Sequence, residues 1–199
     1  MHYLQRLKKD KVLKRLIAQQ KTFTLRKERN LCLYLCQSIM SQQLSIKVAL
    51  VFQNRFMALF GKSKPTAKEI LAVPFAVLRG IGLSNAKATY IHNIAQFALV
   101  QGMETKTLNR MSDDEVKTYL TQIKGVGPWT VEMLLMFALG REDVFSWSDL
   151  GIQNAMRALY NIKTTDKKRF KQRLHQIAEP WAPYRTYACL HLWEWKDKL

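Results

Sequence analysis

The most constraining feature of the sequence is a pair of glycines, Gly125 and Gly127, that separate two helix-like segments. Upstream, Ser112 and Glu115 have the spacing of a capping box, which predicts that a helix begins there. Downstream, Pro128 suits the first turn of a second helix, and apolar residues recur behind it at helical spacing. The sequence therefore predicts a helix, a tight hairpin and a second helix.

The hairpin between these helices has the chemistry of a phosphate-binding turn. Glycine permits positive φ, so the backbone N–H groups of the turn can point outward, where the second helix also offers the positive end of its dipole. We therefore expect a phosphate to be held by one short run of backbone: Lys124, Gly125, Val126, Gly127 and Pro128. An ordinary glycine-containing corner between two helices is the alternative.

The charge of the chain indicates what carries that phosphate. Its 199 residues include 32 Lys and Arg against 15 Asp and Glu, a formal net charge of +17. A chain this basic favours a polyanionic partner, either a nucleic acid or an anionic surface. A ribosomal or chromatin-type protein would have the same charge, but the long apolar helices favour a packed domain. The sequence contains no run of about 18 apolar residues, which is the length that a membrane span requires. We therefore expect no membrane partner and an intracellular protein.

Apolar periodicity and capping residues predict an all-α fold. A hydrophobic content of 48% suffices for a packed core, and no segment has the alternating pattern of a strand. Helices are expected at residues 3–19 with a break near Asp10, at 31–40, 44–60 and 66–73, from Pro74, and at 84–100, 104–109, 112–122, 128–139, 150–160, 166–177 and 184–197.

Three stretches of the sequence resemble one enzyme family. The longest is KGVGPWTVEMLLMFALGREDVF at 124–145, followed by DLG at 149–151; the others are QSIMSQQLS at 37–45 and WAPYRTY at 181–187. Together they resemble the helix-hairpin-helix DNA glycosylases, specifically the DNA-3-methyladenine glycosylase II branch. The family usually has proline at the position of Lys124, and often a second acidic residue or a proline at the positions of Ser148 and Trp147.

This resemblance implies two helical lobes within a single domain, residues 1–199, with a DNA-binding cleft between the lobes. Residues 44–139 would form roughly the middle lobe, and the two termini would form the other. The DNA-gripping hairpin of the family aligns with Gly125 and Gly127. We therefore interpret a second glycine pair, Gly80 and Gly82, as a helix junction rather than as a second phosphate-binding hairpin.

The resemblance also implies a catalytic residue, Asp149. A carboxylate there would stabilise the oxocarbenium-like charge that the sugar develops in the transition state, and would orient the attacking water. An aspartate before a helix is also a common N-cap, which is the alternative. Relatives that also cut the DNA strand have a lysine nucleophile where this chain has Trp129, so we expect no Schiff base and a monofunctional enzyme.

Aromatic residues are the candidates for a base pocket. Purines alkylated at N3 or N7 carry positive charge, which an aromatic face attracts. Trp129 matches a pocket position of the family, and Trp147, Tyr34 and Tyr90 are further candidates, although aromatics at helical spacing usually belong to the core.

Two further motifs align with parts of the family. Gln43 and Leu44 lie in the loop that, in the family, fills the space left by the flipped nucleotide, with Leu44 the expected wedge; an ordinary leucine at a helix start is the alternative. For Tyr184-Arg185-Thr186-Tyr187 we expect a structural role in packing the last helix.

We expect no required cofactor. The family holds a monovalent cation with hairpin carbonyls, which here would be those of Thr121, Ile123 and Val126. Cys32 and Cys36 lie one helical turn apart, where burial as small hydrophobes is favoured over a disulfide, and the chain lacks the cysteines of an iron–sulfur cluster. The four histidines have no zinc spacing.

The leading hypothesis is a monofunctional glycosylase that excises alkylated purines such as 3-methyladenine and 7-methylguanine from double-stranded DNA. We expect a monomer that associates with the nucleoid. Two alternatives are a non-catalytic helix-hairpin-helix module that binds DNA or senses lesions, and a bifunctional glycosylase/lyase. The binding module needs Gly125 and Gly127 but has no use for Asp149, and the lyase is disfavoured by Trp129.

Overall fold

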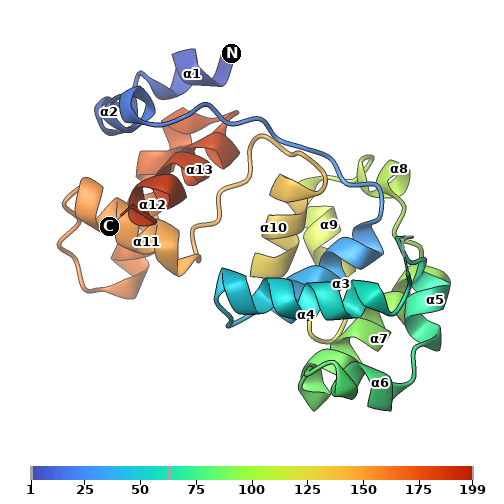
Figure 1. The fold of residues 1–199 in the computed structure, drawn as a ribbon. Helices are drawn as coiled ribbons and strands as arrows, with labels where there is room; N and C mark the ends of the chain where they lie inside the picture. The colour runs from blue at the N-terminus through green and yellow to red at the C-terminus, as the bar shows by residue number, and fades with distance from the viewer. Residues whose placement is uncertain (1, 62–63, 199) are drawn as a thin grey trace. The chain divides into compact units, whose positions relative to one another are not determined.

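The computed structural model describes residues 2–61 and 64–198, and within them every regular element is a helix (Figure 1). The elements are α1 (His2–Leu7), α2 (Lys11–Gln19), α3 (Leu31–Ser41), α4 (Ile46–Ala58), α5 (Ala67–Ala72), α6 (Phe75–Gly80), α7 (Asn85–Val100), α8 (Thr105–Leu108), α9 (Asp113–Leu120), α10 (Pro128–Phe137), α11 (Leu150–Leu159), α12 (Lys167–Ala178), the 3₁₀ helix η1 (Glu179–Trp181) and α13 (Arg185–Lys196). The predicted all-α fold class is confirmed.

The chain forms two compact units. The terminal unit consists of Met1–Arg26 and Gly140–Leu199, and the central unit consists of Lys27–Leu139. The middle lobe was expected to start near residue 44, but the central unit starts at Lys27. It includes α3 because this helix packs against α4, α7 and α10.

Side-chain caps set most of the helix starts. Ser112 and Glu115 form the expected capping box of α9, and Thr66 forms a second one with Glu69 at α5. The predicted segment 3–19 is divided at Asp10, whose Oδ1 accepts hydrogen bonds from the first N–H groups of α2. Between the expected helices 44–60 and 66–73, residues 62 and 63 lie outside the described residues. The short helix η1 was not predicted.

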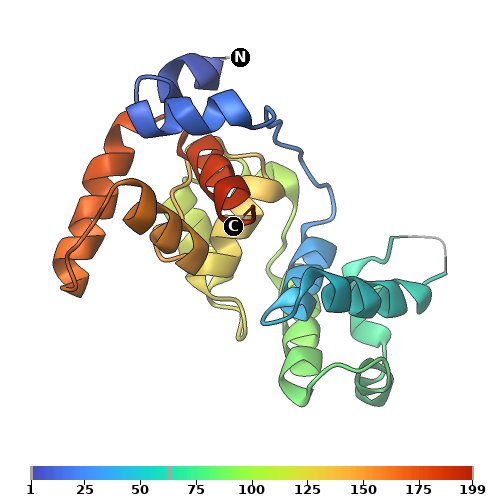
Figure 2. The same cartoon turned by 60° about the vertical axis from the view of Figure 1, so that its left-hand side comes forward.

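The terminal unit joins the two ends of the chain. Helix α13 packs against α2 and α11, and Figures 1 and 2 both show the blue N-terminal helices beside the red α13. The ring of Tyr3 stacks on that of Tyr187 at 4.0 Å between centroids. Asp10 Oδ2 accepts hydrogen bonds from Tyr160 Oη at 2.9 Å and from Trp181 Nε1 at 3.1 Å. One carboxylate thus caps a helix and ties the N-terminal segment to the C-terminal part of the unit.

The central unit is built around α7, which packs against α3, α5 and α6. The second glycine pair lies where α6 meets α7, and Gly82 has φ of +104°. A Cβ on Gly82 would lie 2.5 Å from the Phe52 ring, and Arg55 donates a hydrogen bond to the Ile81 carbonyl at 3.2 Å. Packing against α4 therefore explains this glycine as a helix junction.

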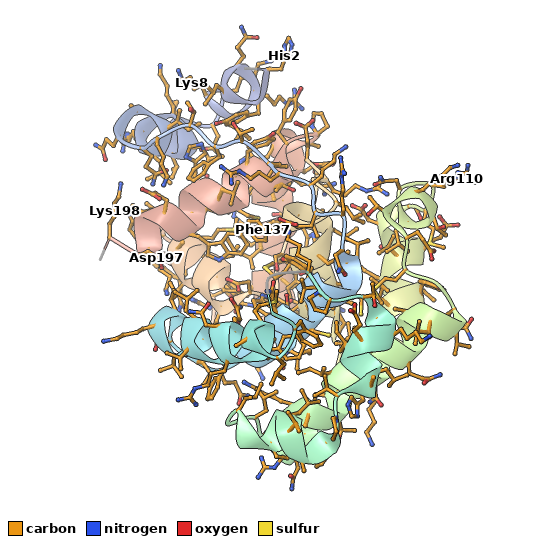
Figure 3. The ribbon with its side chains drawn as sticks, turned by 45° about the vertical axis from the view of Figure 1, so that its right-hand side comes forward. His2, Lys8, Arg110, Phe137, Asp197 and Lys198 are labelled. Carbon is orange, nitrogen blue, oxygen red and sulfur yellow. The ribbon has the colours of Figure 1, made fainter. Side chains whose placement is uncertain are left out.

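The cysteines and the charged side chains are placed as their chemistry requires. Cys32, Cys36 and Cys189 are all buried free thiols, so the expected hydrophobic role is confirmed for Cys32 and Cys36. Basic side chains such as Lys8 and Arg110 project away from the ribbon (Figure 3). None of the helices described is both long enough and apolar enough to cross a membrane.

We predict that Asp10→Asn lowers the free energy of unfolding of the terminal unit by about 1–3 kcal/mol. The amide oxygen of asparagine can still cap α2, but its NH₂ group cannot accept the hydrogen bond of the buried Trp181 indole. Urea unfolding followed by tryptophan fluorescence measures the loss. The control is Asp166→Asn at the exposed N-cap of α12, which should be near neutral. Equal stability of both variants would contradict the role of Asp10 as a link between the termini.

Candidate active site

The predicted hairpin connects α9 to α10, and its apolar residues hold it in place. Ile123 and Val126 are buried, and the Val126 N–H donates a hydrogen bond to the Ile123 carbonyl at 2.9 Å. Pro128 occupies the first turn of α10, as expected, and Gly127 is its N-cap. The exposed part of the hairpin is the Lys124 side chain and the start of α10.

The two glycines of the hairpin have different roles. Gly125 has φ of +106°, and a Cβ there would lie 2.2 Å from Cγ of Tyr90. Gly127 has φ of −96°, and no described protein atom lies within 4 Å of the position that a Cβ would take. Both glycines permit positive φ, but only Gly125 adopts it. Gly127 instead leaves open space beside the first N–H groups of α10, where an external anion can approach.

Neighbouring helices support the hairpin from two sides. On α7, Tyr90 lies against Gly125, and the Asn93 amide donates a hydrogen bond to the Lys124 carbonyl at 3.1 Å. Between α9 and α10, Lys117 Nζ lies 3.4 Å from Oε1 of Glu132, whose side chain is buried. These contacts fix the hairpin backbone before any ligand binds.

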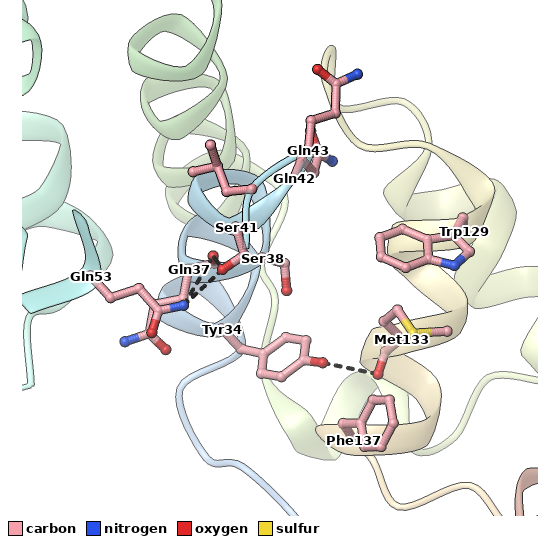
Figure 4. Close-up of a pocket in the computed structure, with 11 residues that line it drawn as sticks. Tyr34, Gln37, Ser38, Ser41, Gln42, Gln43, Gln53, Trp129, Met133 and Phe137 are labelled. Carbon is pink, nitrogen blue, oxygen red and sulfur yellow. Dashed lines mark hydrogen bonds between the residues drawn. The ribbon is translucent and has the colours of Figure 1, made fainter. Parts of the chain in front are cut away.

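A pocket of about 660 Å³ opens in the central unit beside the start of α10 (Figure 4). In Figure 4 the side chains of α3 line one side, and Trp129, Met133 and Phe137 of α10 line the opposite side. The lining residues are Tyr34, Gln37, Ser38, Ser41, Gln42, Gln43, Leu44, Gln53, Trp129, Met133 and Phe137. None of these described lining residues is charged, so the pocket is an aromatic and amide-rich surface.

The structure brings together two of the four aromatic candidates. Trp129 and Tyr34 line the same pocket, and Trp129 keeps 41% of its surface exposed. The Tyr34 hydroxyl donates a hydrogen bond to the Met133 carbonyl at 3.1 Å, and burial raises the pKa of Tyr34 to about 12. Tyr34 therefore stays neutral at physiological pH and presents an uncharged ring.

The other two aromatic candidates lie elsewhere. Tyr90 is not among the described residues that line the pocket, because its ring supports Gly125 of the hairpin. Trp147 belongs to the terminal unit, where Lys171 Nζ lies 4.2 Å from its ring centroid. Helical periodicity gave no means of distinguishing Tyr90 from Tyr34.

The loop between α3 and α4 forms part of the pocket rim. Gln43 is exposed and has φ of +60°, whereas Leu44 is half-buried. Gln42 donates a hydrogen bond from Nε2 to Thr130 Oγ1 at 3.2 Å, which links the loop to α10 next to Trp129. Of the two predicted wedge residues, Gln43 is therefore the one at the tip of the loop.

Asp149 is the N-cap of α11 and is half-buried. Its Oδ1 accepts hydrogen bonds from the Ile152 N–H at 2.9 Å and from Trp193 Nε1 at 2.8 Å. The capping role that was the alternative is therefore present. It is compatible with catalysis, because a cap and an indole donor fix the orientation of the carboxylate.

The loop before Asp149 is anchored by the N-terminus of α13. The Arg185 guanidinium donates two hydrogen bonds to the Asp143 carboxylate, at 2.7 and 2.8 Å, and the Arg185 N–H donates a third at 3.2 Å. The Thr186 hydroxyl accepts from the Val144 N–H at 3.0 Å and donates to the Arg141 carbonyl at 2.7 Å. The closing motif of the sequence thus has a structural role, and what it positions is the segment that leads to Asp149.

The sequence of this chain matches a known protein family. Residues 36–180 match the family model described as HhH-GPD superfamily base excision DNA repair protein. The match covers most of the chain, including the hairpin, Asp149 and the pocket-lining residues other than Tyr34. The chain belongs to the HhH-GPD superfamily. The chain is 37% identical over 162 residues to DNA-3-methyladenine glycosylase 1 of Schizosaccharomyces pombe, covering 80% of this chain and 70% of that protein.

Solved structures agree with this placement in the HhH-GPD superfamily. The S. pombe 3-methyladenine DNA glycosylase in complex with abasic DNA superposes with a TM-score of 0.85 at 32% identity, over 100% of this chain and 98% of that one. A DNA-3-methyladenine glycosidase from Bacillus halodurans gives a TM-score of 0.82 at 34% identity, over 96% and 87%. The predicted family, its 3-methyladenine type and the enzyme class of DNA glycosylase are confirmed.

Several residues of this candidate site were not predicted from the sequence. Gln37 and Ser38 are polar residues within the otherwise apolar α3, which was a usable signal for a pocket. Phe137 and Gln53 gave no such signal. The residues described contain no group of three or more His, Cys, Asp and Glu side chains that could hold a metal ion.

We predict that alanine at Gly125 mainly lowers stability, whereas alanine at Gly127 mainly lowers affinity for DNA. Gly125→Ala should lower the free energy of unfolding by about 2 kcal/mol or more, because it combines positive φ with a clash against Tyr90. Gly127→Ala should cost less, about 0.5–1 kcal/mol, because alanine is a poorer N-cap than glycine but meets no protein atom there, and it should weaken binding to every duplex, damaged or not. Urea unfolding and fluorescence anisotropy with labelled duplex measure the two effects. A folded Gly127→Ala protein with unchanged affinity would contradict the phosphate-binding role of the hairpin.

Proposed function

We propose that this protein is a monofunctional DNA glycosylase that hydrolyses the N-glycosidic bond of alkylated purines in duplex DNA. The observation that carries the proposal is the uncharged aromatic pocket of the central unit, beside the N-terminus of α10. In this proposal the hairpin holds a phosphate of the DNA, the pocket holds the base, and Asp149 acts on the sugar.

The pocket suits a cationic planar base. An aromatic face attracts a cation by about 1–2 kcal/mol more than a neutral ring when both are desolvated. Trp129 and Tyr34 offer such faces, and Gln37, Gln53 and Ser38 offer amide and hydroxyl groups for the edge of the base. Purines alkylated at N3 or N7 carry the required positive charge. The volume of about 660 Å³ is within the range of small-molecule sites.

The hairpin supplies affinity for the DNA backbone. The N–H groups at the start of α10 and the positive end of its dipole favour a phosphate, and the space at Gly127 lets the phosphate approach the backbone. The net charge of +17 adds counterion release on binding. The S. pombe glycosylase with abasic DNA supports DNA as the partner of this chain.

Asp149 performs the chemical step in this proposal. Its carboxylate is held by the Ile152 N–H and the Trp193 indole, so its negative charge is fixed before the reaction begins. When the bond between base and sugar lengthens, the sugar becomes positively charged, and a fixed carboxylate stabilises that charge only in the transition state. Water then attacks the sugar. Trp129 has no amine that could form a Schiff base, so the DNA strand stays intact.

We further propose that the carbonyls of Thr121, Ile123 and Val126 bind a monovalent cation. They follow the C-terminus of α9, where carbonyl groups lack intrahelical donors, and the Ile123 carbonyl accepts one hydrogen bond from the Val126 N–H, which leaves it a second lone pair. Such an ion would add rigidity and positive charge to the hairpin. We propose that the protein acts as a monomer, because one chain supplies the hairpin, the pocket and the carboxylate.

We predict that Asp149→Asn slows base release by about 10²–10³ while lesion DNA still binds. The asparagine oxygen can accept both hydrogen bonds that Asp149 Oδ1 accepts, so the fold is kept and only the charge is lost. Single-turnover release of 3-methyladenine or 7-methylguanine from methylated duplex, identified by mass spectrometry, measures the effect.

The control for this variant is Asp166→Asn, the same change at the N-cap of α12, which should keep the wild-type rate. Equal rates of base release for wild type and Asp149→Asn would mean that Asp149 only caps α11 and is not catalytic. No release by either protein would favour a non-catalytic DNA-binding module.

We predict that the wild-type protein releases the base without cutting the strand. Borohydride should trap no covalent protein–DNA adduct, because position 129 is tryptophan and offers no amine. Gel analysis of the borohydride reaction and of the DNA before alkaline treatment tests this. Efficient trapping would make the enzyme bifunctional.

A further inference from the structure

The loop between α3 and α4 contains a strained turn at the pocket rim. The Leu44 N–H donates a hydrogen bond to the Ser41 carbonyl at 3.3 Å, which closes a four-residue turn. Gln42 has φ of −54° and ψ of 133°, and Gln43 has φ of +60°. These dihedrals are those of a type II turn, which favours glycine at the third position because φ is positive there. Glutamine at this position is strained.

A type I turn would relieve this strain. The two turn types differ by a flip of the peptide that joins the second and third residues, and in type I the third residue has negative φ. Here that peptide joins Gln42 to Gln43, and its oxygen is the Gln42 carbonyl. The strained conformation therefore depends on a group that holds this carbonyl.

Lys87 is that group. Its Nζ donates hydrogen bonds to the Gln42 carbonyl at 2.9 Å and to the Met40 carbonyl at 2.8 Å. Met40 lies in the last turn of α3, whose carbonyls have no intrahelical donor. One ammonium group thus caps α3 and fixes the central peptide of the turn.

Lys87 occupies a position that does not suit a lysine locally. It lies in the first turn of α7, where the positive end of the helix dipole disfavours a cation. Partial burial also lowers the pKa of its ammonium group. Both effects oppose a charged side chain here, and the two carbonyl contacts offset them.

Other contacts fix the flanks of the loop but not its tip. Gln42 Nε2 donates to Thr130 Oγ1, and Gln53 Nε2 donates to Ser41 Oγ at 2.9 Å. The Gln43 side chain is exposed, and Figure 4 shows it at the rim above the pocket. The orientation of the central peptide decides where this side chain points.

We propose that Lys87 is a positioning residue for nucleotide flipping. It holds the peptide between Gln42 and Gln43 in the strained orientation, so that the Gln43 side chain is presented to the duplex and fills the space that the flipped nucleotide leaves. Lys87 itself touches no DNA in this proposal. The inference rests on the proposed glycosylase function and adds a residue that acts through the turn.

The test compares paired and unpaired lesions. Lys87→Met keeps the length and the apolar stem but cannot donate to the carbonyls, so release of 7-methylguanine opposite cytosine should slow by about tenfold or more. With an abasic-site analogue opposite the lesion, less unstacking is needed, and the defect should shrink to about twofold or less. Lys87→Arg, which has several donors for the two carbonyls, should restore most of the rate on the paired substrate.

A double-mutant cycle with Gln43→Gly separates positioning from general stability. Glycine removes both the side chain and the strain, so adding Lys87→Met to Gln43→Gly should slow the paired substrate no further. Thermal unfolding checks that each variant is folded, and Lys87→Gln, with one donor group, replaces Lys87→Met if that variant unfolds. Equal defects on both substrates, additive effects in the cycle, or a wild-type rate for Lys87→Met would each overturn the proposal.

Fluorescence of 2-aminopurine beside the lesion separates this proposal from the proposed function, because it measures unstacking without bond cleavage. We expect the wild-type protein to raise the fluorescence and Lys87→Met to raise it less. A wild-type protein that unstacks the base without releasing it would contradict the glycosylase function, and the same fluorescence comparison would still decide the role of Lys87. A wild-type protein that does neither would overturn both.

Discussion

The close contact between Gly125 and Tyr90 is the constraint on which the candidate site depends. The backbone at Gly125 passes so near the tyrosine ring that no side chain fits between them, and its φ is positive. This contact holds the hairpin against α7, and Asn93 on the same helix holds the Lys124 carbonyl. With the hairpin fixed, α10 starts at Pro128 and its first turn places Trp129 at the pocket. The proposed phosphate site and the proposed base site therefore share one support.

The charges of the site are separated by task. The described residues that line the base pocket are uncharged, whereas the candidate catalytic carboxylate belongs to the terminal unit. In the proposed function, a neutral aromatic pocket favours a cationic base over a neutral one. In the proposed mechanism the Asp149 carboxylate acts on charge that develops on the sugar, and its hydrogen bonds to Ile152 and Trp193 keep it oriented.

Several polar residues of this chain contradict local preference and are explained by tertiary contacts. Lys87 stands at the wrong end of a helix dipole, Gln43 has positive φ, and Glu132 is buried in the apolar α10. Two of them have partners near the hairpin or the pocket: Lys87 holds two carbonyls, and Glu132 pairs with Lys117. Gln43 has the proposed role at the tip of the loop. Such departures from local rules are expected where a fold has to hold a functional loop in one conformation.

The sequence by itself determined the helices, the hairpin and the position of Asp149, because these depend on neighbouring residues. Capping at Ser112, the proline at the start of α10 and the break at Asp10 are interactions within one helical turn, and each was found as expected. The cap at Asp149, which was the alternative to a catalytic role, is equally local. The tertiary structure decided which aromatic rings share a pocket. Tyr34 and Tyr90 both follow helical periodicity, yet one lines the pocket and the other supports Gly125. It also decided that Gly125 requires glycine for packing while Gly127 faces open space, and that Lys87 reaches the carbonyls of Gln42 and Met40. These outcomes depend on residues far apart in the chain, which only the packing of one helix against another brings together.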